Sequence, residues 1–244
     1  MTEPDLGIDR ALALLDWGAT GWGDEIVLGT LVTIALALSA LPLGLVLGLA
    51  AAIARRSSYT IISDLSISFT TVFRALPELL TVFLIFYGGQ ALLSKVSELT
   101  GLGYIELSPF LAGMIALGLV FAAFASEVFT SAFTAIPAGQ RESAMALGLS
   151  PAKSFWLVVA PQLLRHALPG LSNLWLILLK DTSLISVIAL NDLMRVSRVA
   201  ASSESSPVFF YLIALLIYLG LSMLSSIGIG KTRSWAERGL EAGR

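Results

Sequence analysis

The sequence has no cysteine, a single histidine and few charged residues among its 244 positions. The lack of cysteine excludes a disulfide scaffold. With His166 as the only histidine, we expect neither a metal site nor a catalytic triad. Lys and Arg number 15 against 17 Asp and Glu, so no basic excess is present for binding nucleic acid. Charged residues make up only 13% of the chain, against roughly 25% in soluble domains, which excludes that class as well.

What the sequence has in excess is apolar residues, at 56%, with a mean hydropathy of +0.85. Three runs without an ionisable group are each long enough to cross a hydrocarbon core of roughly 30 Å. Two further apolar regions are interrupted by charges. The uninterrupted runs are 26–54, 107–126 and 205–230, and the interrupted regions are 61–94 and about 167–190. The sequence therefore predicts an all-α polytopic membrane protein with five transmembrane helices.

The distribution of charge between loops predicts the orientation. No basic region precedes the first apolar run, so we expect an acidic segment at 1–25 in place of a signal peptide. An N-out arrangement leaves nine Lys and Arg in inner segments and four in outer ones, which favours N-out and C-in. We expect a transmembrane domain over 26–230, an inner loop at 132–165 and an inner tail at 231–244. The inner residues are Arg55, Arg56, Arg141, Lys153, Arg165, Lys231, Arg233, Arg238 and Arg244, and the outer ones are Arg10, Lys95, Arg195 and Arg198.

The inner loop contains the stretch ESAMALGLSPAKSFWLVVAP, which starts at Glu142. Good helix formers precede Gly148, a residue suited to ending a helix with positive φ. Ser150 and Pro151 then match the start of another helix. The pattern predicts two short helices joined at a glycine bend, and the alternative is an ordinary connecting loop.

This stretch resembles the cytoplasmic coupling loop of binding-protein-dependent ABC importer permeases. That pattern is Glu-Ala-Ala, three residues, Gly, nine residues, an aliphatic residue, one residue and Leu-Pro. The chain departs from it at Ser143, where Ala is usual, and at Ala160, where Leu is usual. The resemblance implies a type I importer permease fold whose loop docks on a separate ATPase subunit. The matching positions are Glu142, Ser143, Ala144, Gly148, Val158 and Pro161.

Other stretches are similar to the polar amino-acid permease subfamily, and to its histidine, lysine, arginine, ornithine and octopine branch. They are RALPE at 74–78, FLIFYG at 83–88, 168–184 and LNDL at 190–193. The resemblance implies a subunit of an ATP-driven importer in the bacterial inner membrane. Its implied partners are a second permease, two ATPases that hold Mg-ATP, and an extracytoplasmic solute-binding protein that meets the outer loops.

Charged residues inside the spans are candidates for the substrate pathway, because such charges are costly unless they have a partner or a wet cavity. Lys180 and Asp181, with the Thr182 hydroxyl beside them, either line the pathway or mark a helix end where the lysine reaches the headgroups. Arg74 and Glu78 are four residues apart across Pro77, which predicts an intrahelical pair at a kink, either at the transport site or purely structural.

Two more features of the spans allow more than one interpretation. Glu127 stands in a long uncharged stretch, where a lone carboxylate suits a cationic substrate or simply ends the third helix. Gly44 and Gly48 form a GxxxG pair on the first span, which predicts close helix packing within the chain or with a second permease. We also expect a bend at Pro42.

The sequence argues against an ATPase activity in the chain itself. Gly230-Lys231-Thr232 resembles the end of a phosphate-binding loop, but Ser225 stands where the first glycine is required. The alternative function is a self-contained secondary transporter or channel, which predicts inverted repeats, and none is apparent. A membrane scaffold without transport is disfavoured by the polar groups in the second and fourth spans. We therefore expect a non-enzymatic permease for polar, cationic amino acids or opines.

Overall fold

The computed structural model describes residues 13–18, 21–101 and 103–241, and for 231–241 only the backbone. The described part of the chain is helical and contains no strand. In order, the elements are α2 (Gly23–Arg55), α3 (Thr60–Ala75), α4 (Glu78–Phe83), the π-helical turn η1 (Leu84–Gly88), α5 (Gly89–Thr100), α6 (Pro109–Ala135), α7 (Ala138–Ala146), α8 (Pro151–Ser154), the π-helical turn η2 (Phe155–Val159), α9 (Ala160–Asp181), the 3₁₀ helix η3 (Thr182–Ile188), α10 (Leu193–Ser203) and α11 (Pro207–Glu241).

Within the described residues, five helical segments are long and apolar enough to cross a membrane, which confirms the predicted number. They are Gly23–Arg55, Glu78–Thr100, Pro109–Ala135, Pro151–Ile188 and Pro207–Gly230. The predicted tail over 231–244 is not a separate element up to Glu241, because α11 continues through it. Much of the predicted acidic segment, including Arg10, lies outside the described residues.

The second apolar region is not one kinked span, as the sequence suggested, but two helices that meet at Pro77. Leu76 is extended, with φ −76° and ψ 138°, as the residue before a proline prefers to be. Proline also lacks the backbone N–H that would donate the next helical hydrogen bond. As a result α3 ends at Ala75, and the membrane span begins only at Glu78.

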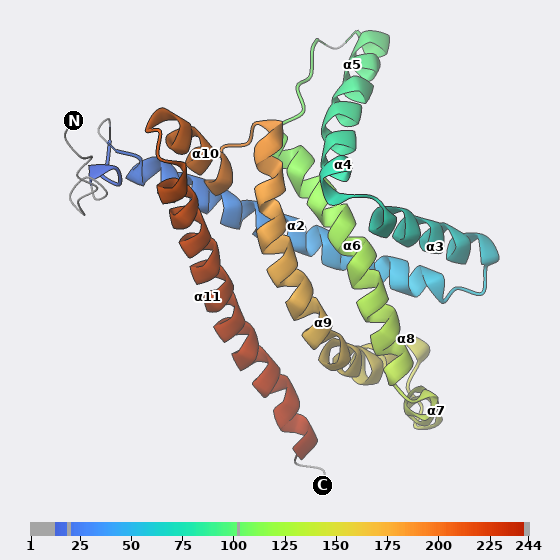
Figure 1. Cartoon of the computed structure of the whole chain (residues 1–244). Coiled ribbons are helices and arrows are strands. Elements are labelled where there is room, and N and C mark those ends of the chain that lie inside the picture. The colour runs from blue at the N-terminus through green and yellow to red at the C-terminus, as the bar shows by residue number, and fades with distance from the viewer. Residues whose placement is uncertain (1–12, 19–20, 102, 242–244) are drawn as a thin grey trace, which may run out of the picture.

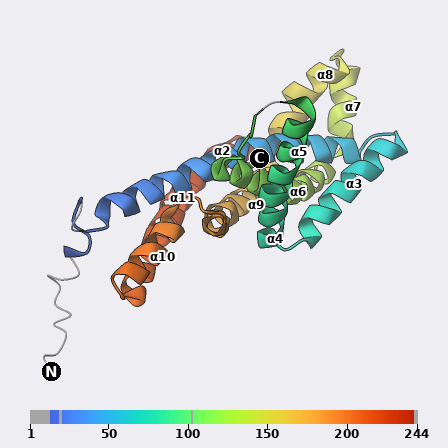
Figure 2. The same cartoon turned by 90° about the horizontal axis from the view of Figure 1, so that it is seen from above.

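Helix α3 packs back along the end of α2 through serine hydroxyls. Ser63 donates a hydrogen bond to the Arg55 carbonyl oxygen at 3.1 Å, and Ser66 donates to the Ala51 carbonyl oxygen at 2.7 Å. Seen from above, α3, α7 and α8 gather at one end of the molecule, and α10 and the start of α2 lie at the other (Figure 2). The helix-loop-helix of the coupling loop therefore lies at the α3 end.

The core forms where α2 crosses α6, and glycine makes the crossing possible. A Cβ on Gly44 would lie 2.5 Å from the Phe121 ring, and one on Gly48 would lie 2.8 Å from the Ala125 Cβ. The GxxxG pair therefore serves packing within the chain. Pro42 sits inside α2, which runs unbroken past it. Figure 1 shows α2 crossing behind α6 and α9, with α11 standing further out.

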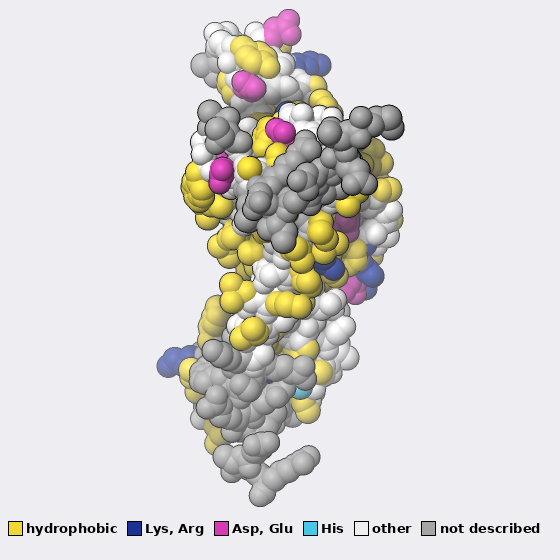
Figure 3. All heavy atoms as spheres, turned by 60° about the vertical axis from the view of Figure 1, so that its left-hand side comes forward, with side chains coloured by type: hydrophobic (Ala, Val, Ile, Leu, Met, Phe, Trp, Pro, Cys, Tyr) yellow, Lys and Arg dark blue, Asp and Glu magenta, His cyan; other side chains and the backbone are white. Residues whose placement is uncertain are grey.

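The outer surface of the bundle is apolar, as a lipid-exposed protein requires. Large hydrophobic side chains of α2 and α11 are exposed, including Val46 at 67% and Leu224 at 70%. In Figure 3, hydrophobic side chains cover much of the visible described surface, and charged ones are few. In water such a surface would drive aggregation, whereas in a bilayer it matches the surrounding acyl chains.

Candidate coupling helix and intramembrane charged sites

Helix α7 is a short helix outside the spans, and its end has the geometry that glycine permits. The Leu149 amide donates to the Ala144 carbonyl at 3.2 Å, and the Gly148 amide donates to the Met145 carbonyl at 3.0 Å. These two bonds form a Schellman motif, which requires a left-handed residue after the helix. Gly148 supplies it with φ of +85°. The predicted helix end at this glycine is confirmed.

The second predicted helix also starts where expected, but it is not a short separate one. Ser150 caps α8 by accepting a hydrogen bond from the Lys153 amide at 3.4 Å, and Pro151 occupies the first turn. The chain then continues through η2 into α9 without a break, so Pro151–Ile188 is one candidate span. The glycine bend therefore joins α7 directly to a membrane helix. This arrangement suits the transmission of a displacement, because no flexible segment intervenes.

The six residues of the coupling pattern divide between the surface and the packed side of this corner. Glu142, Ser143, Gly148 and Pro161 are exposed, Val158 is half-buried, and Ala144 is buried. One further contact ties the corner together. The Gln162 side-chain amide donates to the Gln140 side-chain oxygen at 3.3 Å and to the Val158 carbonyl at 2.9 Å. Gln162 and Gln140 lie outside the motif, so the motif alone did not indicate them.

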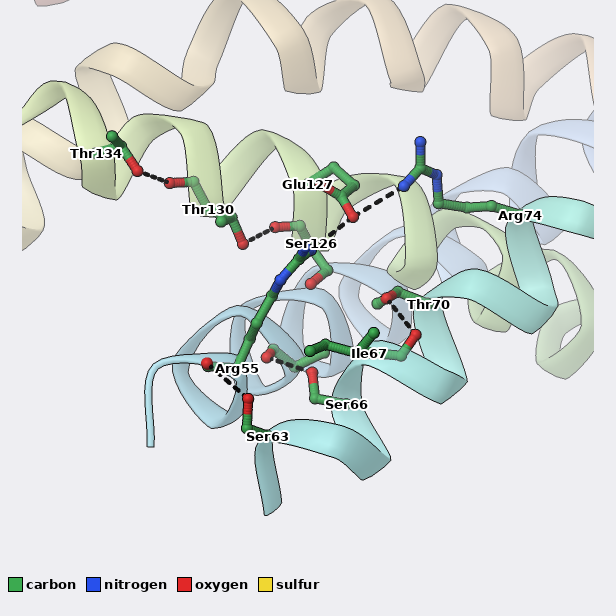
Figure 4. Close-up of polar contacts among 11 residues, drawn as sticks. Arg55, Ser63, Ser66, Ile67, Thr70, Arg74, Ser126, Glu127, Thr130 and Thr134 are labelled. Atoms are coloured by element: carbon green, nitrogen blue, oxygen red, sulfur yellow. Dashed lines mark hydrogen bonds and ion pairs between the residues drawn. The ribbon is translucent and has the colours of Figure 1, made fainter. Parts of the chain in front are cut away.

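Glu127 is not a lone carboxylate, because it forms ion pairs with two arginines from different helices (Figure 4). Its Oε1 lies 2.7 Å from Nη1 of Arg55, at the end of α2, and 2.8 Å from Nη1 of Arg74, at the end of α3. The predicted pair between Arg74 and Glu78 does not form, because the break at Pro77 removes the helical register that such a pair needs. One carboxylate thus joins three helices and leaves a net positive charge.

On the other side of this cluster lies a small cavity with two acidic residues. Glu78, at the start of the second span, and Asp181, at the end of α9, both line it together with apolar residues of α6 and α9. Phe124 also lines the cavity, and its ring centroid lies 5.8 Å from the Arg74 guanidinium carbon. The tertiary structure therefore places Phe124 next to both the acidic pair and Arg74 of the basic cluster.

The two neighbours of Asp181 face different surroundings. Lys180 is exposed and forms no ion pair with any described acidic residue. Thr182 is buried, and its hydroxyl donates to the Leu179 carbonyl at 2.7 Å. The hydroxyl is thus used locally, where α9 tightens into η3.

A buried carboxylate that was not among the predicted site residues lies just before α10, within the LNDL stretch. Asp192 is fully buried, and its Oδ1 caps the helix by accepting from the Arg195 amide at 3.1 Å. Its second oxygen, Oδ2, has no hydrogen-bond partner. Burial raises the pKa of Asp192 to about 6, and the amides of Arg195 and Met194 and the charge of Arg198 oppose this rise.

Comparison with known proteins agrees with this architecture. Residues 40–230 match the family model of the binding-protein-dependent transport system inner membrane component. The nopaline transport system permease protein of Agrobacterium fabrum (strain C58) is 41% identical over 95% of this chain and 99% of the relative. The arginine ABC transporter permease protein of Escherichia coli (strain K12) is 40% identical over 79% of this chain and 87% of its own length.

Solved structures show the same fold. A crystal structure of an amino acid ABC transporter with histidines superposes with a TM-score of 0.75 at 25% identity, covering 96% of this chain and 99% of that one. An inward-facing methionine ABC transporter gives a TM-score of 0.70 at 16% identity, covering 95% and 99% of the two chains. The chain therefore belongs to the family of binding-protein-dependent transport system inner membrane components, and it is a permease subunit of an ABC importer in the bacterial inner membrane.

Proposed function

We propose that this permease carries polar, cationic amino acids or opines, paired with a second permease subunit, two ATPase subunits and an extracytoplasmic solute-binding protein. The observation that carries the substrate proposal is the pair of carboxylates, Glu78 and Asp181, which line one cavity inside the spans. At about 20 Å³ the cavity has room for a water molecule and not for an amino acid, so the pair is proposed to line a path that opens during transport. The names of the relatives support the same class, since they are a nopaline and an arginine permease.

The charges around Phe124 suit a substrate with both signs of charge. Glu78 and Asp181 attract a cationic group, and Arg74, which stacks on Phe124, attracts a carboxylate. Glu127 keeps Arg74 in place and neutralises only part of the positive charge. Among the remaining candidates, we assign the exposed Lys180 to the lining of the substrate path. We assign Thr182 a structural role, because its hydroxyl bonds to the Leu179 carbonyl at the end of α9.

A direct test replaces both acidic groups without changing their shape. Uptake of labelled arginine into vesicles holding the complete transporter and internal ATP is measured for Glu78→Gln with Asp181→Asn. Loss of charge-assisted contacts of about 1.5–3 kcal/mol is expected to lower uptake by roughly tenfold or more. Glu98→Gln, an exposed residue of α5 away from the cavity, serves as the control. Unchanged uptake in the double variant would exclude the acidic cavity as the substrate site.

We further propose that the coupling residues Glu142, Ser143, Ala144, Gly148, Val158 and Pro161 form the ATPase-docking corner. The exposure of Glu142 and the hydrogen-bonded Schellman end at Gly148 support this role. Glu142→Lys is expected to uncouple ATP hydrolysis from uptake or to prevent assembly with the ATPase, and Glu98→Lys is the control. ATP hydrolysis is assigned to the separate subunit, so uptake by this chain alone without ATP would instead favour the alternative of a secondary transporter.

The proposed topology is N-out and C-in, with residues 1–25 outside, the domain 26–230 in the membrane and the tail 231–244 inside. Of the predicted loop 132–165, only residues 136–150 lie between candidate spans, and this part is placed inside. Because the sequence has no cysteine, single cysteines report accessibility without background. Leu147→Cys, just after α7, and Leu99→Cys, near the end of α5, place a thiol on exposed positions, and these two helices lie at opposite extremes of Figure 1. A membrane-impermeant maleimide applied to whole spheroplasts is expected to label position 99 only. Labelling of position 147 alone would show that the orientation is the reverse of the proposed one.

A further inference from the structure

A groove with a volume of about 920 Å³ lies where three membrane spans end, beside the coupling helix. Ile53 and Ala54 belong to the last turn of α2, Phe133 to the last turn of α6, and Phe155 to the start of the fourth span. Pro151 and Val159 of the same span and residues beyond the span ends complete the lining. The groove therefore straddles the boundary between the hydrocarbon core and water.

The lining is apolar within the spans, whereas beyond them it combines two basic residues with apolar ones such as Ile62 and Ile136. Within the spans it presents the side chains of Ile53, Phe133 and Phe155, and beyond them it presents Arg56 and Arg141. An apolar slot that ends in two guanidinium groups matches the chemistry of a phospholipid, whose phosphate sits at the interface and whose acyl chains lie beside the helices. Basic pockets between membrane helices bind anionic headgroups in this manner.

Both arginines are available for a ligand. Neither Arg56 nor Arg141 forms an ion pair with any described acidic residue. The Arg56 guanidinium carbon lies 5.1 Å from the Phe133 ring centroid, a stacking that orients the group and leaves its N–H donors free for phosphate. Glu142 is the single acidic residue of the lining, so the groove has a net positive charge.

The surroundings favour a lipid over a protein or a free anion. Next to the groove, Ile61 is 76% exposed and Ile62, which lines it, is 44% exposed. Both belong to α3, just beyond the first span, and they continue the exposed apolar surface up to the groove. A free phosphate ion would gain nothing from such walls, and a water-soluble ATPase surface has no access to side chains within the spans.

We propose that this groove binds one anionic phospholipid, with its phosphate between Arg56 and Arg141 and its acyl chains along Ile53, Ile62 and Phe133. The lipid would connect the end of α2 to the coupling helix α7, which carries Arg141. The assignment of the lipid to the inner leaflet rests on the proposed topology. Binding itself depends only on the span ends and the charges.

The experiment measures lipid retained by the complete transporter. The complex is reconstituted in vesicles of phosphatidylcholine and phosphatidylglycerol, extracted in mild detergent, washed, and analysed by native mass spectrometry. Wild type is expected to keep phosphatidylglycerol in preference to phosphatidylcholine. Arg56→Gln with Arg141→Gln is expected to lower that retention by roughly tenfold or more, since two charge-assisted contacts are lost. Excess inorganic phosphate is expected not to displace the lipid.

Two further variants keep the test decisive. Lys153→Gln with Arg165→Gln removes two exposed charges from the same end of the molecule but outside the groove, and retention is expected to stay at the wild-type level. Ala138→Trp fills the groove from α7 while keeping both arginines, and it is expected to lower retention even if the double arginine variant fails to assemble. Equal loss in the control, displacement by phosphate, or full retention in Ala138→Trp would overturn the proposal. None of these outcomes bears on which solute is transported.

Discussion

Removing the Glu127 carboxylate is expected to destabilise the permease, because this one group neutralises two arginines. In Glu127→Gln, Arg55 and Arg74 lose contacts of 2.7 and 2.8 Å and remain as two adjacent positive charges. Charge-assisted hydrogen bonds contribute about 1.5–3 kcal/mol when buried, whereas exposed pairs contribute about 0–1 kcal/mol.

The exposure of the three side chains places this cluster between those limits. Glu127 is 33% exposed, Arg55 32% and Arg74 42%. We therefore expect a loss of about 1–2 kcal/mol in the free energy of unfolding. For a chain of about 150–250 residues this corresponds to a decrease in Tm of roughly 2–8 °C. The ion pair between Arg74 and Glu127 also links α3 to α6, so transport is expected to fall together with stability.

Thermal unfolding of the purified permease, followed by tryptophan fluorescence, provides the measurement. Glu106→Gln is the matched control, since Glu106 is exposed and forms no ion pair with a described residue. A double-mutant cycle with Arg55→Gln isolates the coupling. We expect the two changes to be non-additive by at least about 0.5 kcal/mol. A Tm for Glu127→Gln equal to that of the control, with an additive cycle, would refute a stabilising role for the cluster.

Three other predictions concern packing, the coupling corner and pH. Gly48→Ala places a methyl group 2.8 Å from the Ala125 Cβ, so thermal unfolding is expected to show a loss of about 1–3 kcal/mol in the free energy of unfolding. The control Gly220→Ala, whose methyl group has nothing within 4 Å, is expected to leave stability unchanged. Gly148→Ala forces alanine to φ +85°, at a cost of about 1–2 kcal/mol, and is expected to weaken ATPase co-purification, unlike Gly139→Ala. The folded-state pKa of Asp192, about 6, exceeds the unfolded value of 3.8. The free energy of unfolding is therefore expected to fall by up to about 3 kcal/mol as pH rises from about 4 to about 6, and to stay level above pH 6. Comparing unfolding across this range with Asp192→Asn, which keeps a capping oxygen, is expected to show the slope in wild type alone.

Each of these predictions has a result that contradicts it. If Gly48→Ala unfolds like Gly220→Ala, the crossing of α2 and α6 is looser than the structure shows. Full co-purification of Gly148→Ala would remove the requirement for a left-handed bend. An equal slope in Asp192→Asn would assign the pH dependence to another group.

The local features of the chain were predictable because they depend on neighbours in sequence. Span length, the Schellman end at Gly148 and the capped start at Ser150 follow from runs and short motifs, and the structure confirms them. The prediction of an ion pair between Arg74 and Glu78 was wrong, and the reason is also local. The sequence predicts a kink at Pro77, whereas the proline ends the helix, so the two charges belong to different helices.

The sequence by itself determined that this is a five-span membrane protein with a short helix that ends at Gly148, because hydrophobicity and capping act over a few turns of chain. Only the tertiary structure decided which charges meet. Arg55, Arg74 and Glu127 are joined by the packing of α2 and α3 on α6, and Glu78 approaches Asp181 across about a hundred residues of chain. A charge inside a membrane must find a partner or a wet cavity, but which one it finds depends on helix crossings that small residues such as Gly44 and Gly48 permit.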